Sequence, residues 1–287
     1  MAPRIRSVTE SDTIHVGRIM HDAFRGIAEA HGFHPDLHDV EDGVRLADTF
    51  IASPTMFGVV AEQDGHIVGS NFLAEGDPIR AVATLTVDPR FQGRGVGRAL
   101  MAAVLERAET AASVRLVADA FNVRSVPLYA SMGFEVKEPL LVMRGTCRSG
   151  PLPGYVTRPL VADDLADCAT LADKVYGAER TAELRGAINL FKPFVVETDG
   201  RVRGYLSSAT LWLANHGIAE TESDLRALIA GASAVIDGPI SFLLPVRQAS
   251  LFQWCISEGL HVVKPMVLMA KGEYHQPGGA WFPSVSY

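Results

Sequence analysis

The stretch ATLTVDPRFQGRGVGRALM occupies residues 83–101 of a 287-residue chain. Its β-branched start predicts a strand that ends at the Asp88-Pro89 step. Three alternating glycines follow, and apolar residues at helical spacing then predict a helix from about Gly95 to Ala111. A strand, a glycine loop and a helix in direct succession indicate an α/β unit with a binding site at the loop.

The glycine loop has the composition of an anion site. Glycines leave main-chain N–H groups free to turn inward and leave room for a bulky ligand. The start of the following helix adds unsatisfied donors and partial positive charge. Arg94 and Arg98 can add charge-assisted hydrogen bonds. We therefore expect a phosphate or pyrophosphate cradle; the alternative is that the glycines form only a tight strand-to-helix turn.

Two common phosphate motifs do not fit this loop. It lacks the Gly-Lys-Ser/Thr ending of a P-loop. Five residues separate Val87 from Gly93, whereas the glycine loop of a dinucleotide-binding fold follows its strand at once. Neither a P-loop nucleotide site nor a dinucleotide site is therefore expected.

Two motifs together identify a family resemblance. Gln92-x-x-Gly95-x-Gly97, after the strand, resembles the acetyl-CoA motif of the GNAT acetyltransferases. The later stretch NVRSVPLYASMGF, residues 122–134, resembles that family's next motif, including its Leu-Tyr and Gly-Phe pairs. The motifs stand in the family's order and cover about the first half of the chain. The resemblance implies an acetyl-CoA-dependent N-acetyltransferase that works by direct attack in a ternary complex.

The resemblance also implies site residues. Main-chain N–H groups of the glycine loop would hold the CoA pyrophosphate, and the preceding strand would pair with the pantetheine arm. Asn122 would hydrogen-bond that arm, and Tyr129 would protonate the departing thiolate, since a phenol with a free pKa near 10 is protonated at neutral pH. The expected cofactor-binding residues are Leu85, Val87, Gln92, Gly93, Arg94, Gly95, Val96, Gly97, Arg98 and Asn122.

Other polar residues near the predicted strand ends offer further roles. An amine nucleophile must lose a proton, so a general base is expected. Its candidates are Glu75, Asp77 and Asp119, each of which can also be a solvated carboxylate; we select Glu75 as the catalytic base. Ser125 can cap the short helix that carries Tyr129. The histidine-containing loop at 31–38 is rich in turn-forming residues, and we expect no metal there.

Three landmarks recur in the same order and indicate a duplicated chain. They are an Ile/Val-started strand before a helix at 5–12 and 156–164, an Asp-Gly hairpin at 59–69 and 195–204, and a short helix that ends at Gly133 and again at Gly259. We predict two tandem GNAT-like domains, each a mixed, largely antiparallel central sheet flanked by helices. The catalytic domain covers residues 1–147, a linker 148–154, and a degenerate domain 155–287.

The second copy departs from the motif. Alignment at the two glycines places Asn122 on Gln248 and Tyr129 on Cys255. No glycine loop precedes them; instead Thr221-Glu222-Ser223-Asp224 precedes a helix, and its carboxylates would repel a pyrophosphate. We therefore expect no acetyl-CoA in this half, which could keep a fold role, wall the acceptor pocket or build a dimer.

Composition limits the partners. The formal net charge is -7, which does not suit nucleic acid, and no apolar run approaches the length of a membrane span. Three cysteines far apart in sequence argue against disulfides or a zinc cluster, so we expect a cytoplasmic protein, a monomer or a homodimer. The expected acceptor is a primary amine on a small molecule. A non-catalytic acyl-CoA sensor, another acyl-CoA donor and a protein amine remain as alternatives.

Overall fold

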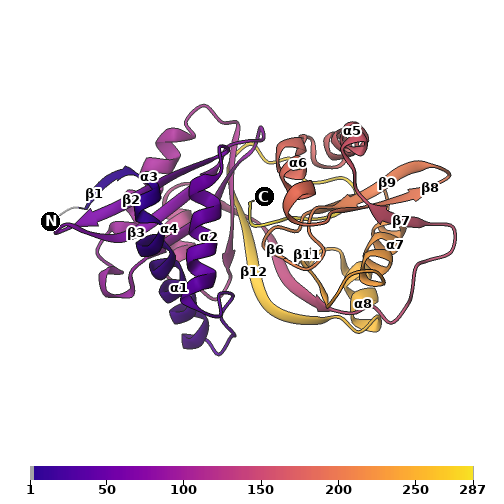
Figure 1. Cartoon of the computed structure of the whole chain (residues 1–287), viewed down its shortest axis with the longest axis horizontal. Helices are drawn as coiled ribbons and strands as arrows, with labels where there is room; N and C mark the ends of the chain where they lie inside the picture. The colour runs from indigo at the N-terminus through magenta and orange to yellow at the C-terminus, as the bar shows by residue number, and fades with distance from the viewer. Residues whose placement is uncertain (1–2, 287) are drawn as a thin grey trace.

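The computed structural model describes residues 3–286 and contains two halves that lie side by side (Figure 1). The first half contains β1 (Arg4–Ser7), η1 (Glu10–Asp12), α1 (Thr13–Ala30), α2 (Val40–Ala52), β2 (Met56–Gln63), β3 (His66–Ala74), β4 (Arg80–Val87), η2 (Pro89–Phe91), α3 (Val96–Arg107), β5 (Ser113–Asp119), α4 (Ser125–Ser131) and β6 (Glu135–Gly145). The second half contains β7 (Val156–Pro159), η3 (Ala162–Asp164), α5 (Leu165–Tyr176), α6 (Thr181–Leu190), β8 (Phe194–Thr198), β9 (Arg201–Leu206), β10 (Gly217–Ala219), α7 (Glu222–Ser233), β11 (Ile240–Pro245), α8 (Ala249–Ser257), β12 (His261–Gly272) and β13 (Ala280–Phe282).

A repeated ion-pair group supports the predicted duplication. Arg6 Nη1 lies 2.7 Å from Asp12 Oδ2, and Arg6 Nε lies 2.8 Å from Glu62 Oε1. In the second half Arg158 contacts Asp164 at 2.7 Å and also Glu197, which are the residues at the corresponding places. Both hairpins turn at an Asp-Gly pair in which both residues have positive φ, as a type I′ turn requires.

The strands form an eight-stranded sheet in the order β1-β2-β3-β4-β5-β12-β6-β11 and a five-stranded sheet in the order β13-β10-β9-β8-β7. Pairing is antiparallel throughout except between β4 and β5, which are parallel. The predicted fold class, mixed α/β with largely antiparallel sheets flanked by helices, is confirmed. α3, the helix that follows the glycine loop, ends at Arg107. This is earlier than the predicted Ala111, because residues 108–110 form a turn.

The two halves exchange their strands. β12, from the second half, pairs with β5 of the first half, where Met266 stands opposite Asp119. In return β6, from the first half, pairs with β11 of the second, and β6 and β12 pair with each other between β5 and β11. The segment 148–154 connects β6 to β7, but a division into 1–147 and 155–287 does not describe this exchange. Each half therefore supplies a strand that pairs with strands of the other half in the eight-stranded sheet.

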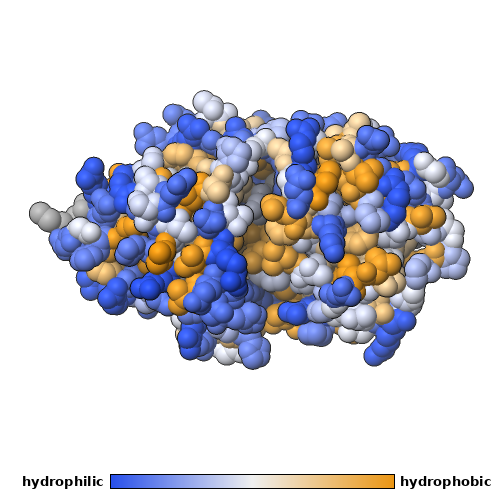
Figure 2. Space-filling model, viewed as in Figure 1, coloured by the Kyte–Doolittle hydropathy of each residue, from blue (hydrophilic) through white to orange (hydrophobic). Residues whose placement is uncertain are grey.

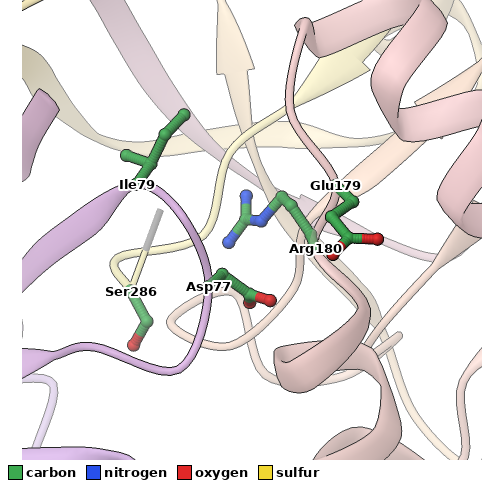
Figure 3. A pocket seen from close by; sticks show the side chains of 5 residues that line it. All are labelled: Asp77, Ile79, Glu179, Arg180 and Ser286. Atoms are coloured by element: carbon green, nitrogen blue, oxygen red, sulfur yellow. The ribbon is translucent and has the colours of Figure 1, made fainter. Parts of the chain in front are cut away.

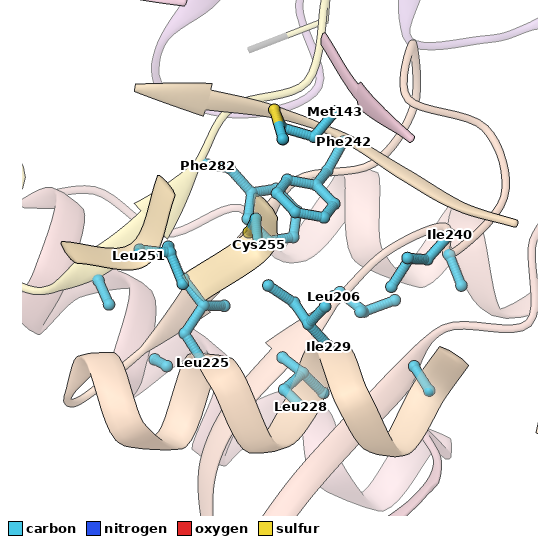
Figure 4. Packing of buried hydrophobic residues seen from close by; sticks show 14 of the residues in the cluster. Met143, Leu206, Leu225, Leu228, Ile229, Ile240, Phe242, Leu251, Cys255 and Phe282 are labelled. Atoms are coloured by element: carbon cyan, nitrogen blue, oxygen red, sulfur yellow. The ribbon is translucent and has the colours of Figure 1, made fainter. Parts of the chain in front are cut away.

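Helices cover both faces of the first half's sheet. Leu100 and Val104 of α3 pack with Tyr129 of α4 on one face, and Met20 of α1 packs with Phe72 of β3 on the other. In the second half α7 lies against the sheet, and Met143 of the exchanged β6 joins its core (Figure 4). The surface is hollowed where the two halves meet (Figure 2). None of the helices between residues 3 and 286 is both long and apolar enough to cross a bilayer.

Candidate functional site

The strand and loop of the opening motif border a split in the sheet. β4 and β5 pair only from Arg80 to Val82, so the strands separate beyond Val82. Asp88 N–H donates to Val68 O at 3.0 Å on β3, and main-chain groups of an antiparallel pair alternate in direction. The main-chain groups of Leu85 and Val87 therefore face away from β3, toward the split. An extended ligand can hydrogen-bond to this free strand edge.

The glycine loop lies at the end of β4 and is open. Gly93 and Gly95 have φ of 74° and 85°, a conformation that favours glycine, and a Cβ built on either would meet nothing within 4 Å. Gly95 is the N-cap of α3 without a side-chain cap bond. Within residues 3–286, no protein acceptor takes the N–H groups of residues 93–98. These free donors at a helix N-terminus fit a pyrophosphate.

Side chains around the loop hold its shape. Gln92 Nε2 donates to Val87 O at 3.1 Å, and Gln92 Oε1 accepts from Arg124 Nη1 at 3.3 Å. Gln92 thus occupies the Val87 carbonyl and joins the loop to the next motif. Arg94 stacks over Phe91 at 5.6 Å, and Arg98 donates to Ser131 Oγ at 2.6 Å. Both arginines are exposed and lie next to the open donors, so their charge is available to an anion.

Asn122 makes the cap predicted for Ser125. Asn122 Oδ1 accepts from the N–H of Arg124 at 3.2 Å and of Ser125 at 3.0 Å, whereas α4 has no side-chain cap of its own. Asn122 lies two and three residues before these N–H groups, so its side chain can accept from both of them. The Ser125 hydroxyl accepts from neither. No acceptor for the Asn122 side-chain NH₂ lies in the described part of the chain, so this donor remains for a ligand.

Tyr129 is buried on α4. Its side chain is 8% exposed, and its ring meets Phe134 edge-on at 6.2 Å. Burial raises the pKa of the Tyr129 hydroxyl to about 12, although a hydrogen bond with the Ser125 side chain opposes the shift and the charge of Asp119 adds to it. The phenol is therefore protonated at neutral pH and can donate a hydrogen bond.

The three carboxylates considered as the base have different partners. Both oxygens of Glu75 are bound by Arg107, at 2.8 and 2.9 Å, and this hydrogen bonding lowers the pKa of Glu75. Asp77 accepts from the N–H groups of Ala182 and Glu183 at the start of α6. Asp119 lies at the end of β5, where the split opens. A paired carboxylate of lowered pKa is a weak proton acceptor, so this geometry does not favour Glu75.

Lysine 264 was missed by reasoning from sequence. Its Nζ lies 2.8 Å from Asp119 Oδ1, although β12 belongs to the other half of the chain. The signal available in the sequence was one lysine within the apolar run VVKPMVLMA. Its partner was not visible, because only the exchange of strands brings β12 beside β5.

In the second half, the counterpart of the split is filled by the chain itself. β13 pairs with β10, the counterpart of β4, and Phe282 lies so close that a Cβ on Gly217 would be 2.2 Å from its ring. Gln248, aligned with Asn122, binds the main chain of Trp281: its Nε2 donates to the carbonyl at 2.6 Å and its Oε1 accepts from the N–H at 3.3 Å.

The helix start in the second half is also closed. The side chains of Thr221 and Asp224 cap α7 reciprocally, since Thr221 Oγ1 accepts from Asp224 N–H and Asp224 Oδ2 accepts from Thr221 N–H. The Cys255 thiol at the Tyr129 position is buried, and burial raises its pKa to about 12. This half therefore lacks the open features of the first.

The halves also meet around a small cavity. Asp77 and Ile79 of the first half lie there with Glu179 and Arg180 of the second, and Ser286 of the tail completes the lining (Figure 3). Arg180 is buried and pairs with Glu183, whose N–H is held by Asp77. This cavity therefore lies within the contact between the two halves.

Residues 37–148 match the family model described as an acetyltransferase (GNAT) domain. This part of the chain belongs to the GNAT acetyltransferase family. A mycothiol acetyltransferase of Thermobifida fusca is 29% identical over 154 residues, which cover 48% of this chain and 47% of that protein. The chain thus spans about half the length of this curated relative.

Solved structures share the whole fold. A candidate acetyltransferase from Pyrococcus horikoshii aligns with a TM-score of 0.78 at 14% identity, over 99% of this chain and 95% of that one. A tandem GNAT protein from the clavulanic acid biosynthesis pathway aligns with a TM-score of 0.58 at 15% identity, over 93% and 98% of the two chains. The predicted tandem GNAT fold is confirmed by these likenesses.

Proposed function

We propose that the protein is an acetyl-CoA-dependent N-acetyltransferase that transfers an acetyl group to a primary amine of a small molecule. One observation carries the proposal. The unbound N–H groups of residues 93–98 lead directly to the unpaired edge of β4 at Leu85. A ligand that fits both must combine a pyrophosphate with an extended, amide-bearing arm, and CoA has this combination.

Each part of the site has a task in this proposal. The loop from Gly93 to Arg98 would hold the pyrophosphate, with Arg94 and Arg98 adding charge. The main chain of Leu85, the Val87 N–H and the Asn122 side-chain NH₂ would hold the arm, while Gln92 and Val96 keep the loop and helix start in place. When bound, the cofactor supplies an acetyl group activated as a thioester. Fixed main-chain donors at the split can stabilise negative charge that develops during transfer.

The second half supports the proposed position of the pantetheine arm along β4. There an extended peptide, β13, lies along the counterpart of β4 and is held by Gln248, the residue aligned with Asn122. An extended backbone with its amides therefore fits beside such a strand and within reach of such a side chain. The first half has no protein segment in this position within residues 3–286, and the proposed arm takes it.

We assign the proton transfers to Tyr129 and Asp119. The Tyr129 hydroxyl holds a proton beside the split, and Asp119 is close enough to influence its pKa. Arg107 binds both oxygens of Glu75, whereas Lys264 contacts Oδ1 of Asp119. Among the three candidate carboxylates, Asp119 alone lies at the opening between β4 and β5, so we replace Glu75 with Asp119 as the base. The relative named a mycothiol acetyltransferase supports an acceptor that is a small molecule.

The test is to measure CoA binding by calorimetry and to titrate free thiol during incubation with acetyl-CoA and a panel of primary amines. The expected result is one CoA bound per chain, because the second half is closed, and amine-dependent release of thiol. A chain that does not bind CoA would refute the proposal. Binding without amine-dependent release would support a non-catalytic acyl-CoA sensor instead, and faster release from another acyl-CoA would change the donor.

A further inference from the structure

A buried cluster of charges joins three distant parts of the chain beside the split. Lys264 Nζ lies 2.5 Å from Asp36 Oδ2 and 2.8 Å from Asp119 Oδ1, and the lysine side chain is 3% exposed. Asp36 comes from the loop between α1 and α2, Asp119 from the end of β5, and Lys264 from β12 of the second half. The cluster exists only because β12 lies next to β5.

The cluster lies on the α1 side of the sheet. Ala118 belongs to the core under α3 and α4, so its neighbour Asp119 faces the opposite side. Thr84 of β4 stands opposite Phe72, which packs against α1, and it therefore shares that side. The Thr84 hydroxyl is more than nine-tenths buried and has no hydrogen-bond partner in residues 3–286. Thr84 on β4 and Asp119 on β5 thus face the α1 side of the sheet. Tyr129 lies on the opposite side, with α3.

The charges of the cluster do not balance. Two carboxylates surround one ammonium, so the cluster carries one negative charge when both are ionised, and buried charges are costly unless paired. Burial opposes the charge of Lys264, yet the carboxylates outweigh it and the pKa of Lys264 rises. Burial raises the pKa of Asp36, and the charges of Lys264 and His38 only oppose the rise, so burial disfavours the ionised form of Asp36 in this cluster. A second cation would complete the cluster.

We propose, on the basis of the function proposed above, that Asp36 and Asp119 bind the ammonium group of the acceptor amine. Lys264 is a positioning residue that holds the two carboxylates at the split. Trp212, whose ring lies 5.0 Å from Lys264 Nζ and is partly exposed, offers an aromatic wall from the second half.

This arrangement selects a class of acceptor. A carboxylate next to the reacting amine would face Asp36 and Asp119 and be repelled, because like charges in one site disfavour each other. The site therefore suits a small primary amine whose ammonium is its only charge near the reacting nitrogen. The second half, which is closed to CoA, then serves to choose the acceptor.

The test is direct binding by calorimetry, with and without CoA, of 2-phenylethylamine, of phenylalanine, which adds a carboxylate, and of 2-phenylethanol, which lacks the charge. We expect the amine to bind at least about tenfold more tightly than either analogue, as for a charge-assisted contact. Asp119→Asn should remove this preference while the dissociation constant of CoA stays unchanged. Failure of the amine to bind, equal binding of phenylalanine, or an intact preference in the variant would overturn the proposal.

Substitutions in the second half test whether that half contributes to binding of the amine. Lys264→Arg should keep the amine preference and Lys264→Met should lose it; unchanged CoA affinity shows that a variant is folded. If Lys264→Met does not fold, Trp212→Ala should weaken amine binding several-fold and Trp212→Phe should largely restore it. Unchanged amine binding in Trp212→Ala would overturn the role of the second half. If the wild-type chain does not bind CoA, the proposed function is refuted. The comparison of amine and analogues without CoA still tests whether Asp36 and Asp119 bind the ammonium group.

Discussion

Gly95→Glu is the sharpest perturbation of the glycine loop, because the chain offers a matched control. Gly95 has φ of 85° and Gly154, in the segment between the halves, has φ of 84°. A Cβ built at either position meets nothing within 4 Å, so neither substitution causes a steric clash. The two glycines differ in their surroundings, since Gly95 is the N-cap of α3 and borders the proposed pyrophosphate site, whereas Gly154 lies between β6 and β7.

The stability change should be the same for both variants. A non-glycine residue in the left-handed region costs about 1–2 kcal/mol. For a chain of this size, that corresponds to a loss of roughly 2–8 °C in melting temperature at about 2–4 °C per kcal/mol. Thermal unfolding of Gly95→Glu and Gly154→Glu measures this backbone strain, and a similar loss in both would show that it is independent of the site.

The effect on CoA should separate them. A carboxylate about 4 Å from a phosphate charge is disfavoured by roughly 1 kcal/mol in a water-like medium and by roughly 4 kcal/mol at an effective dielectric constant of about 20. At about 1.4 kcal/mol per factor of ten, we expect the dissociation constant of CoA to rise at least about tenfold in Gly95→Glu and not at all in Gly154→Glu. Equal affinities in calorimetry would refute the assignment of the loop to the pyrophosphate.

Three further predictions follow from the site and its repeat. Asn122→Ala should raise the dissociation constant of CoA about fivefold, whereas Gln248→Ala should leave it unchanged and lower the unfolding free energy by about 1–3 kcal/mol, since it frees β13; the opposite pattern would contradict the alignment of the two halves. Tyr129→Phe should lower kcat without changing CoA affinity, and full turnover would remove the hydroxyl from the mechanism. The Arg6 hydrogen bond lowers the pKa of Asp12 from 3.8 to about 2, so Asp12 contributes about 2 kcal/mol of stability above pH 4 that is lost as the pH falls through about 2. In acid unfolding, Asp12→Asn should lack this loss of stability. The same loss at low pH in the variant and in the wild type would contradict the role of Asp12.

Local chemistry accounts for the features that reasoning from sequence predicted well. β4 ends at Val87, before the Asp88-Pro89 step as predicted, and the hairpins turn at Asp-Gly pairs as expected. The glycine loop is open because its conformation is set by Gly93 and Gly95 and by the start of α3. Such features depend on neighbours in the sequence, so periodicity and turn residues are sufficient to find them. The prediction for Ser125 was wrong because Asn122, three residues away, competes for the same helix start.

Partners from distant segments were decided by the tertiary structure. Arg107 could be assigned to Glu75, and Lys264 to Asp36 and Asp119, only after the strands were placed. β6 and β12 follow equivalent helices and glycines, and either could pair within its own half; the sequence pattern is the same for both arrangements. Strand pairing is chosen by the packing of whole sheets and not by local preference. The sequence by itself therefore determined the open glycine loop at the start of α3, and the fold alone determined which charges stand beside the split and from which half they come.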